Sequence, residues 1–315
     1  AVAKWKSETE STSDEKLKLN LLRPDERGEI PGLLRVNFDP MLVKLLREVK
    51  YFLLLEIPVP EAAMKTYQRG ETLRQQTGNL DLIVVTYNNI LRTLLDVERP
   101  MVQERLTAIQ DMLQMAVATL NWNSFKIDEY IKEVMAAVKE LNHIMDTIKG
   151  NVEKTQALLK EWEENPMIQR KEGKTYEISE FGDLQRATQE ARNKKISEAS
   201  VAVAKLLSNS NKIVDVPRSS AAWRTYVEYF NDIVTQGFSD AILASTTYLE
   251  TQIDPARMAA EETAPLVEVS LDLRNPDVRW SPEIGVGEPG GEPGVRDHLD
   301  AWVGGFQAIG TLMKR

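Results

Sequence analysis

One long stripe of apolar residues dominates the hydrophobic pattern of this chain. It runs from Ile127 to Trp162 at spacings that alternate between four and three, and only Thr155 interrupts its apolar character. An α-helix places such positions on one face, and so regular a seam predicts packing against at least one other helix. At 1.5 Å per residue this helix would be about 55 Å long. The pattern favours an elongated helical scaffold over the alternative, a core stripe within a globular all-α enzyme.

A second strongly apolar segment covers residues 41–57, directly after Asp39 and Pro40. Aspartate is a favourable N-cap, and proline in the first turn loses no hydrogen bond, so a helix is predicted to begin here. Its apolar residues cover more than half of the circumference, which predicts a buried helix. They are Leu42, Leu45, Leu46, Val49, Phe52, Leu53 and Leu54.

Helical spacing continues over most of the remaining chain. We expect a turn at Gly78–Asn79 and an N-cap at Ser124, while the sequence leaves open whether Pro100 kinks one long helix or separates two. The expected helices, besides the two above, cover residues 60–76, 80–97, 102–120, 178–209, 219–252 and 297–315.

The spacing changes near residue 266. Val267, Val269, Leu271 and Leu273 alternate with polar residues, which is the pattern of a half-buried strand. A turn at residues 275–277 lets the following residues return as a second strand, so we expect one small β-hairpin near 266–281. A loop rich in Gly, Pro and Glu then extends to residue 296.

These elements predict a mainly all-α fold, arranged as an elongated series of antiparallel helical bundles with long amphipathic helices. The chain has no initiator methionine and ends within a predicted helix, so we expect a fragment of a longer protein. The expected parts are a polar leader or connector (1–36), a first helical bundle (37–165), a second bundle (166–255), the hairpin with its Gly/Pro loop (256–296), and the start of a truncated helix (297–315).

Charge and composition narrow the classes of partner. The 315 residues include 39 basic and 48 acidic side chains, a net charge of −9, without a conspicuous basic run, so we expect neither nucleic acid nor membrane as a partner. The absence of cysteine excludes disulfides, thiolate metal sites and a cysteine nucleophile. No apolar run approaches the roughly 20 residues of a membrane span.

Two short motifs resemble functional sites, but neither has the required context. Residues Gly285 to Gly290 match a dinucleotide-binding pattern, although Glu288 and Pro289 place a negative charge and a missing N–H donor within the turn. Glu140 and His143 form only half of a di-iron motif, and the other histidine, His298, lacks the matching glutamate. We therefore expect no catalytic, cofactor-binding or metal-binding residues, and the sequence does not assign partner-binding residues.

Several ordered segments carry a resemblance to the N-terminal tail region of dynein heavy chains, especially axonemal ones of the outer-arm type. The resemblance covers most of the chain from about Leu17, and the order and spacing of its motifs are more specific than any single motif. The motifs are Leu34–Pro40, Leu45–Tyr51, Glu98–Pro100, Leu120–Ser124, Trp162 with Pro166 and Arg170–Lys171, Val278–Pro282 and Gly294–Asp297.

The resemblance implies a non-catalytic tail segment rather than a motor, because the family's ATP-hydrolysing ring and microtubule-binding stalk lie C-terminal of this region. The implied partners are other dynein heavy chains, intermediate and light chains, and axonemal docking proteins on the doublet microtubule. The implied location is the cytoskeleton of the cilium or flagellum, within the cytoplasm. The alternative is a spectrin-like helical-bundle adaptor, which would require a repeated three-helix unit that the sequence does not show.

Overall fold

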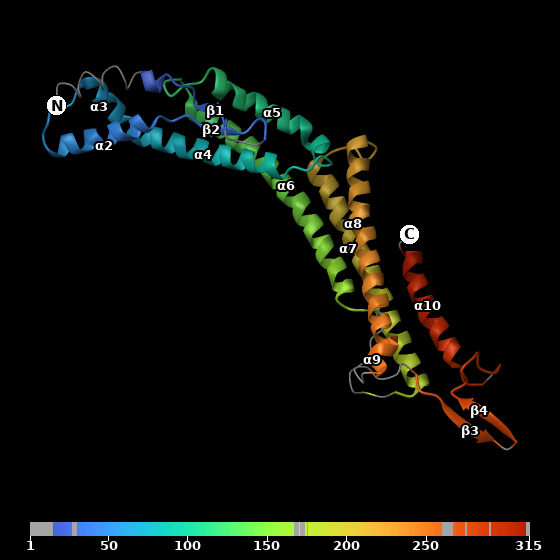
Figure 1. Ribbon diagram of the computed structural model, residues 1–315. Coiled ribbons are helices and arrows are strands. Elements are labelled where there is room, and N and C mark those ends of the chain that lie inside the picture. The colour runs from blue at the N-terminus through green and yellow to red at the C-terminus, as the bar shows by residue number, and fades with distance from the viewer. Residues whose placement is uncertain are drawn as a thin grey trace. The chain divides into compact units, whose positions relative to one another are not determined.

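The structure is a computed structural model that describes residues 15–26, 30–166, 170, 174, 176–259, 267–274, 276–289 and 291–312. These residues are mainly α-helical, which confirms the predicted fold class (Figure 1). The elements are β1 (Leu22–Pro24), β2 (Leu34–Val36), α2 (Pro40–Leu54), α3 (Glu61–Gln68), α4 (Gly70–Thr93), α5 (Arg99–Ala118), α6 (Ile127–Glu163), α7 (Ile178–Val214), α8 (Ala221–Ile253), α9 (Pro255–Ala259), β3 (Ser270–Arg274), β4 (Asp277–Ser281) and α10 (Val295–Leu312).

The chain divides into two compact units. Unit 1 comprises Ala1–Ile148 and Ile213–Trp223, and unit 2 comprises Lys149–Lys212 and Arg224–Arg315. The division falls inside α6, the helix that the apolar stripe predicts, so this single helix contributes its first half to unit 1 and its second half to unit 2. No described helix is both long and apolar enough to cross a membrane.

The core of unit 1 is formed by one apolar face from each of its long helices. In α6 the stripe is buried as expected, with Val138 and Leu141 almost fully removed from solvent. The facing helices α4 and α5 contribute further buried side chains at helical spacing, which explains why they fold as amphipathic helices. These side chains are Leu80, Ile83, Tyr87, Leu106, Ile109 and Leu113.

The segment before α2 is part of this core. The prediction of a polar leader is therefore wrong for residues 15–26 and 30–36. Residues 1–14 lie outside the described part. Strands β1 and β2 form an antiparallel pair in which Leu22 lies opposite Val36. The buried indole of Trp122 donates a hydrogen bond from Nε1 to the Asn37 carbonyl at 3.0 Å. The segment is too short to show a helical or strand period, so its four buried leucines gave no signal: Leu17, Leu21, Leu22 and Leu33.

The turn predicted at Gly78–Asn79 does not exist, because α4 continues through both residues. Leu73 before the glycine and Leu80 after it are both buried on one face of α4, and their packing keeps this stretch helical in spite of the glycine. The chain instead leaves the helical path between α3 and α4, next to Gly70. A Cβ atom at Gly70 would lie only 3.1 Å from Leu46 Cδ2, so the glycine permits close packing of α2.

The helix boundaries around α5 and α6 also differ from expectation. Helix α4 ends at Thr93, and Pro100 lies in the first turn of α5. The proline therefore separates two helices rather than kinking one. Ser124 is not the N-cap of α6. Its Oγ accepts from the Asn121 amide at 2.9 Å and closes the preceding turn, while α6 begins only at Ile127.

Unit 2 is built around the second half of α6 with α7 and α8 (Figure 1). Asn151 of α6 donates from Nδ2 to Ser210 Oγ of α7 at 2.9 Å, and the ring of Trp162 lies 5.0 Å from that of Phe238 on α8. Gly237 allows α8 to approach α6 closely, since a Cβ atom there would lie 2.7 Å from Leu159.

Helix α10 packs on α7 through an aromatic pair and a glycine. The rings of Phe181 and Trp302 are 5.6 Å apart, and His298 lies against Gly182, where a Cβ atom would come within 2.6 Å of the imidazole. Leu299 and Val303 are exposed, because the helix is rotated so that His298 and Trp302 face α7. The Phe306 and Ile309 side chains lie outside the described part.

The predicted hairpin is present as β3 and β4, with Leu271 opposite Trp280 and Leu273 opposite Val278. The expected half-burial of its apolar face is wrong: Leu271 is 62% and Leu273 78% exposed. The alternation correctly identified the strands, but it could not show whether this chain supplies a cover for their apolar face.

Candidate partner-binding site

Within the described residues, no group of three or more His, Asp or Glu could hold a metal ion, so neither histidine belongs to such a group. His143 lies on the exposed face of α6, as expected. Its neighbour Glu140 reaches instead toward Arg105 of α5, at 3.8 Å. His298 lies in unit 2, buried beside Gly182.

The glycine-rich loop before α10 is closed by a carboxylate of the chain itself. Asp297 Oδ2 accepts hydrogen bonds from the backbone N–H of Gly287 at 2.7 Å and of Gly294 at 2.9 Å. A Cβ atom at Gly287 would clash with the carbonyl of Glu292, so the tight loop requires glycine there. The Gly287 N–H, which lies in the middle of the dinucleotide-like motif, therefore already binds Asp297.

We expect this loop closure to depend on pH. The hydrogen bonds from Gly287 and Gly294 lower the pKa of the Asp297 carboxyl below its ordinary value of 3.8. Because the folded-state pKa is lowered, the stabilisation is complete above the ordinary value and is lost as the pH falls through the lower folded-state pKa. Selective ¹⁵N-glycine NMR should show both amide resonances shifting together with a midpoint below 3.8. An Asp297→Asn variant should lack this titration, and a midpoint at or above 3.8 would contradict the closure.

Helix α2 leaves an apolar face uncovered, contrary to the prediction that it is buried. Only Leu42, Leu45 and Val49 are buried, while Tyr51 is 56% and Leu54 69% exposed. The pattern was correct about apolar character but could not show which face this chain covers. We call the uncovered side the α2 outer face; it comprises Met41, Val43, Tyr51, Leu54 and Leu55, with Arg47 and Lys50 between them.

A hollow of about 440 Å³ lies between the end of α6, the middle of α7 and α8 in unit 2. Its apolar floor is formed by Trp162, Ile196 and Phe238, which belong to one packed group of side chains. Alanines on α7 and α8 complete the lining, and their small side chains leave the space open. They are Ala187, Ala191 and Ala241.

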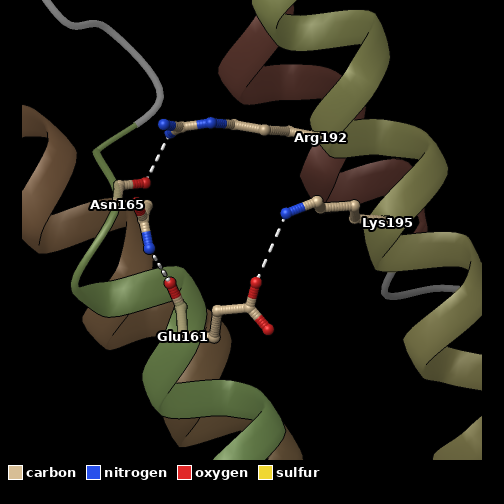
Figure 2. Close-up of polar contacts among 4 residues, drawn as sticks. All are labelled: Glu161, Asn165, Arg192 and Lys195. Atoms are coloured by element: carbon tan, nitrogen blue, oxygen red, sulfur yellow. Dashed lines mark hydrogen bonds and ion pairs between the residues drawn. The ribbon is translucent and has the colours of Figure 1, made fainter.

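The lip of this hollow is polar and joins α6 to α7, as Figure 2 shows. The Arg192 guanidinium donates from Nη1 to the main-chain carbonyl of Asn165, whose side-chain Nδ2 donates to the Glu161 carbonyl at 2.7 Å. Lys195 Nζ lies 3.4 Å from Glu161 Oε1. Both members of that ion pair are more than half exposed, so the pair contributes little to stability.

Arg192 differs from the other polar residues at the rim of the hollow. It is half-buried and forms no ion pair with any described residue, and its guanidinium donates a hydrogen bond to the uncharged Asn165 carbonyl. Burial lowers the pKa of the guanidinium, which nevertheless stays charged at neutral pH. An apolar hollow with a cation at its mouth suits an apolar side chain that is followed closely by a carboxylate.

Sequence reasoning did not identify these residues. The apolar spacing in α7 is poor, and nothing in the local pattern distinguishes the half-buried Arg192 from the exposed cations of the helix. The one available signal is the end of the α6 stripe at Trp162, which indicates an aromatic side chain facing the neighbouring helices.

These observations define the class of the chain as a mainly α-helical segment of two units with uncovered apolar surfaces. Comparison with known proteins then gives its family. Residues 1–130 match the family model described as "Dynein heavy chain, N-terminal region 1". The chain is 42% identical to the flagellar outer-arm dynein beta chain of Chlamydomonas reinhardtii, in an alignment that covers all of this chain and 8% of that protein.

Two further relatives come from animals. The ciliary dynein beta chain of Heliocidaris crassispina is 36% identical over 83% of this chain and 6% of its own length, and mouse dynein axonemal heavy chain 17 is 32% identical over 96% of this chain and 7% of its own length. The chain belongs to the dynein heavy chain family, among its axonemal members of cilia and flagella, and represents part of their N-terminal region. It spans less than a tenth of the length of these relatives.

Proposed function

We propose that this segment is a non-catalytic assembly scaffold in the tail of an axonemal dynein heavy chain. In this role it associates with other heavy chains and with intermediate and light chains, and it helps to anchor the motor to the doublet microtubule through docking proteins. The observation that supports the proposal most directly is the α2 outer face, which exposes large apolar side chains within the residues that match the dynein N-terminal region. Exposed apolar patches of this kind are typical of protein–protein contacts.

The spectrin-like alternative has less support. Helices α6, α7 and α8 are long and pack together, with 37, 37 and 33 residues, but the helices of unit 1 have very different lengths. An array of spectrin type would require several copies of one such three-helix unit.

A pull-down from ciliary extract tests the scaffold proposal. We expect the immobilised chain to retain dynein heavy, intermediate or light chains. Replacing Leu54 by Glu should reduce retention by about fivefold or more, since it places a charge in an apolar contact. Leu243 on α8, which is 64% exposed against 69% for Leu54, provides the matched control: Leu243→Glu should leave retention unchanged. Retention of no dynein chain, or equal retention by the wild type and Leu54→Glu, would contradict the proposal.

A further inference from the structure

The hollow described above continues along α6 and α7 as a longer groove. A second, shallower depression is lined by Lys154, Ala157 and Leu158 of α6 and by Ala202, Lys205 and Leu206 of α7. At 3.6 residues per turn, these α6 residues lie on the same side of the helix as Glu161 and Asn165, and the α7 residues lie on the same side as Ala191 and Lys195. The hollow and the depression therefore form one groove, which we call the α6–α7 groove.

The length of the α6–α7 groove suits a helix. Between Arg192 and Lys205 the α7 backbone rises by about 20 Å, which corresponds to about 14 residues of a helix lying along the groove. Helix α10 contacts α7 at Gly182 and at Gln189, and it lines neither depression. Among the described residues, α6, α7 and α8 thus form three members of a bundle, and the position against α6 and α7 has no fourth helix.

The charge of the groove determines which kind of helix fits. The residues that line the hollow and the depression include four cations, Lys154, Arg192, Lys195 and Lys205, and one anion, Glu161. Glu198 lies between Lys195 and Ala202 on the same side of α7 and adds a second anion. This excess of positive charge occurs on a chain with a net charge of −9, so it is local. Arg192 in particular is half-buried without a carboxylate partner among the described residues. Burying a cation costs less when a carboxylate pairs with it, and arginine can form two parallel hydrogen bonds to one carboxylate.

We propose that the α6–α7 groove binds an acidic amphipathic helix of a partner protein. One large apolar side chain of that helix fills the hollow above Trp162 and Phe238, and a carboxylate one turn away pairs with Arg192. Further acidic residues lie near Lys205 and Lys154. Such helix-in-groove recognition reads apolar anchors at helical spacing, and here the cations add a requirement for negative charge. The groove lies in unit 2, so the proposal is independent of the α2 outer face.

The test uses a synthetic helical peptide of about 14 residues, with Leu and Phe at helical spacing and Glu at the flanking positions. Binding to the 315-residue chain is measured by fluorescence anisotropy of the labelled peptide. Two further peptides serve as comparisons: one has Lys in place of each Glu, and the other has the same composition with the apolar spacing scrambled. We expect binding of the acidic helix only.

Variants of the chain locate the site. Arg192→Glu should weaken binding of the acidic peptide by about tenfold or more, because it removes the pairing cation and adds repulsion. Ala191→Phe should weaken it by blocking the hollow. Arg186 is exposed on α7 and does not line the groove, so Arg186→Glu makes the same charge change and should alter affinity by less than about twofold. Circular dichroism establishes that all three variants remain folded.

Several outcomes would overturn the proposal. These are no binding of the acidic peptide, equal binding of the acidic and basic peptides, or affinity unaffected by both Arg192→Glu and Ala191→Phe. If the wild-type chain self-associates in sedimentation experiments and Arg192→Glu abolishes this, the occupant is a second copy and the proposed partner helix is wrong. Failure of this test leaves the pull-down test of the scaffold role unaffected, because that test changes Leu54 in unit 1.

Discussion

Replacing Leu141 by Asp should unfold unit 1 under conditions in which the wild type is fully folded. Leu141 is 1% exposed in the middle of the α6 stripe. The substitution removes a packed apolar side chain and places an unpaired carboxylate where there is no water to solvate it. Loss of the leucine alone costs about 2–5 kcal/mol, and the buried charge adds to this. The total is comparable to the whole stability of an ordinary domain.

Urea unfolding followed by circular dichroism measures this effect. Ala136 provides the matched control, since it lies on the exposed face of the same helix and Ala136→Asp introduces the same side chain. There the change should cost less than about 1 kcal/mol, the difference in helix propensity. Equal unfolding midpoints for the two variants would show that the stripe is not a core.

The α6 stripe also shows what the sequence can reveal. A strict period over many turns leaves one helical solution, and the predicted helix matches the observed one to within a residue at its C-terminal end. Hairpin β3–β4 was found in the same way, from a two-residue period. Both signals are local, since they depend only on which side chains can share a face.

The predictions that failed depend on contacts between segments that are distant in the sequence. The pattern identifies a face as apolar, but burial depends on what covers it. The α2 helix was therefore wrongly expected to be buried, and the hairpin was wrongly expected to be half-buried. Gly78 was read as a turn because its weak helix propensity was the only local information, whereas packing of Leu73 and Leu80 on one face of α4 decided the outcome. The hollow could not be predicted because its residues come from three helices that are distant in the sequence.

The N-terminal segment is the clearest such case, and it provides the second prediction: Trp122→Ala should destabilise unit 1 by about 3–5 kcal/mol. Trp122 is fully buried, its ring lies 4.9 Å from that of Phe38 in an edge-to-face arrangement, and its indole N–H binds the Asn37 carbonyl. The substitution leaves a large cavity and a partly buried carbonyl without its indole donor. It removes the contacts of Trp122 with Asn37 and Phe38, which join the loop after α5 to the chain that leads into α2.

Trp122→Phe separates the contribution of ring packing from that of the hydrogen bond, because it keeps an aromatic ring but lacks the N–H donor. We expect it to destabilise unit 1 by about 1–3 kcal/mol. Trp280, in the exposed hairpin, is the control, and Trp280→Ala should change stability by less than about 0.5 kcal/mol. Hydrogen exchange adds a local measurement. The Leu21 and Asn37 amides, which bind the Leu120 and Leu21 carbonyls, should lose protection in Trp122→Ala. If they exchange as slowly as in the wild type, Trp122 does not hold this segment, and the segment must be fixed by its buried leucines alone.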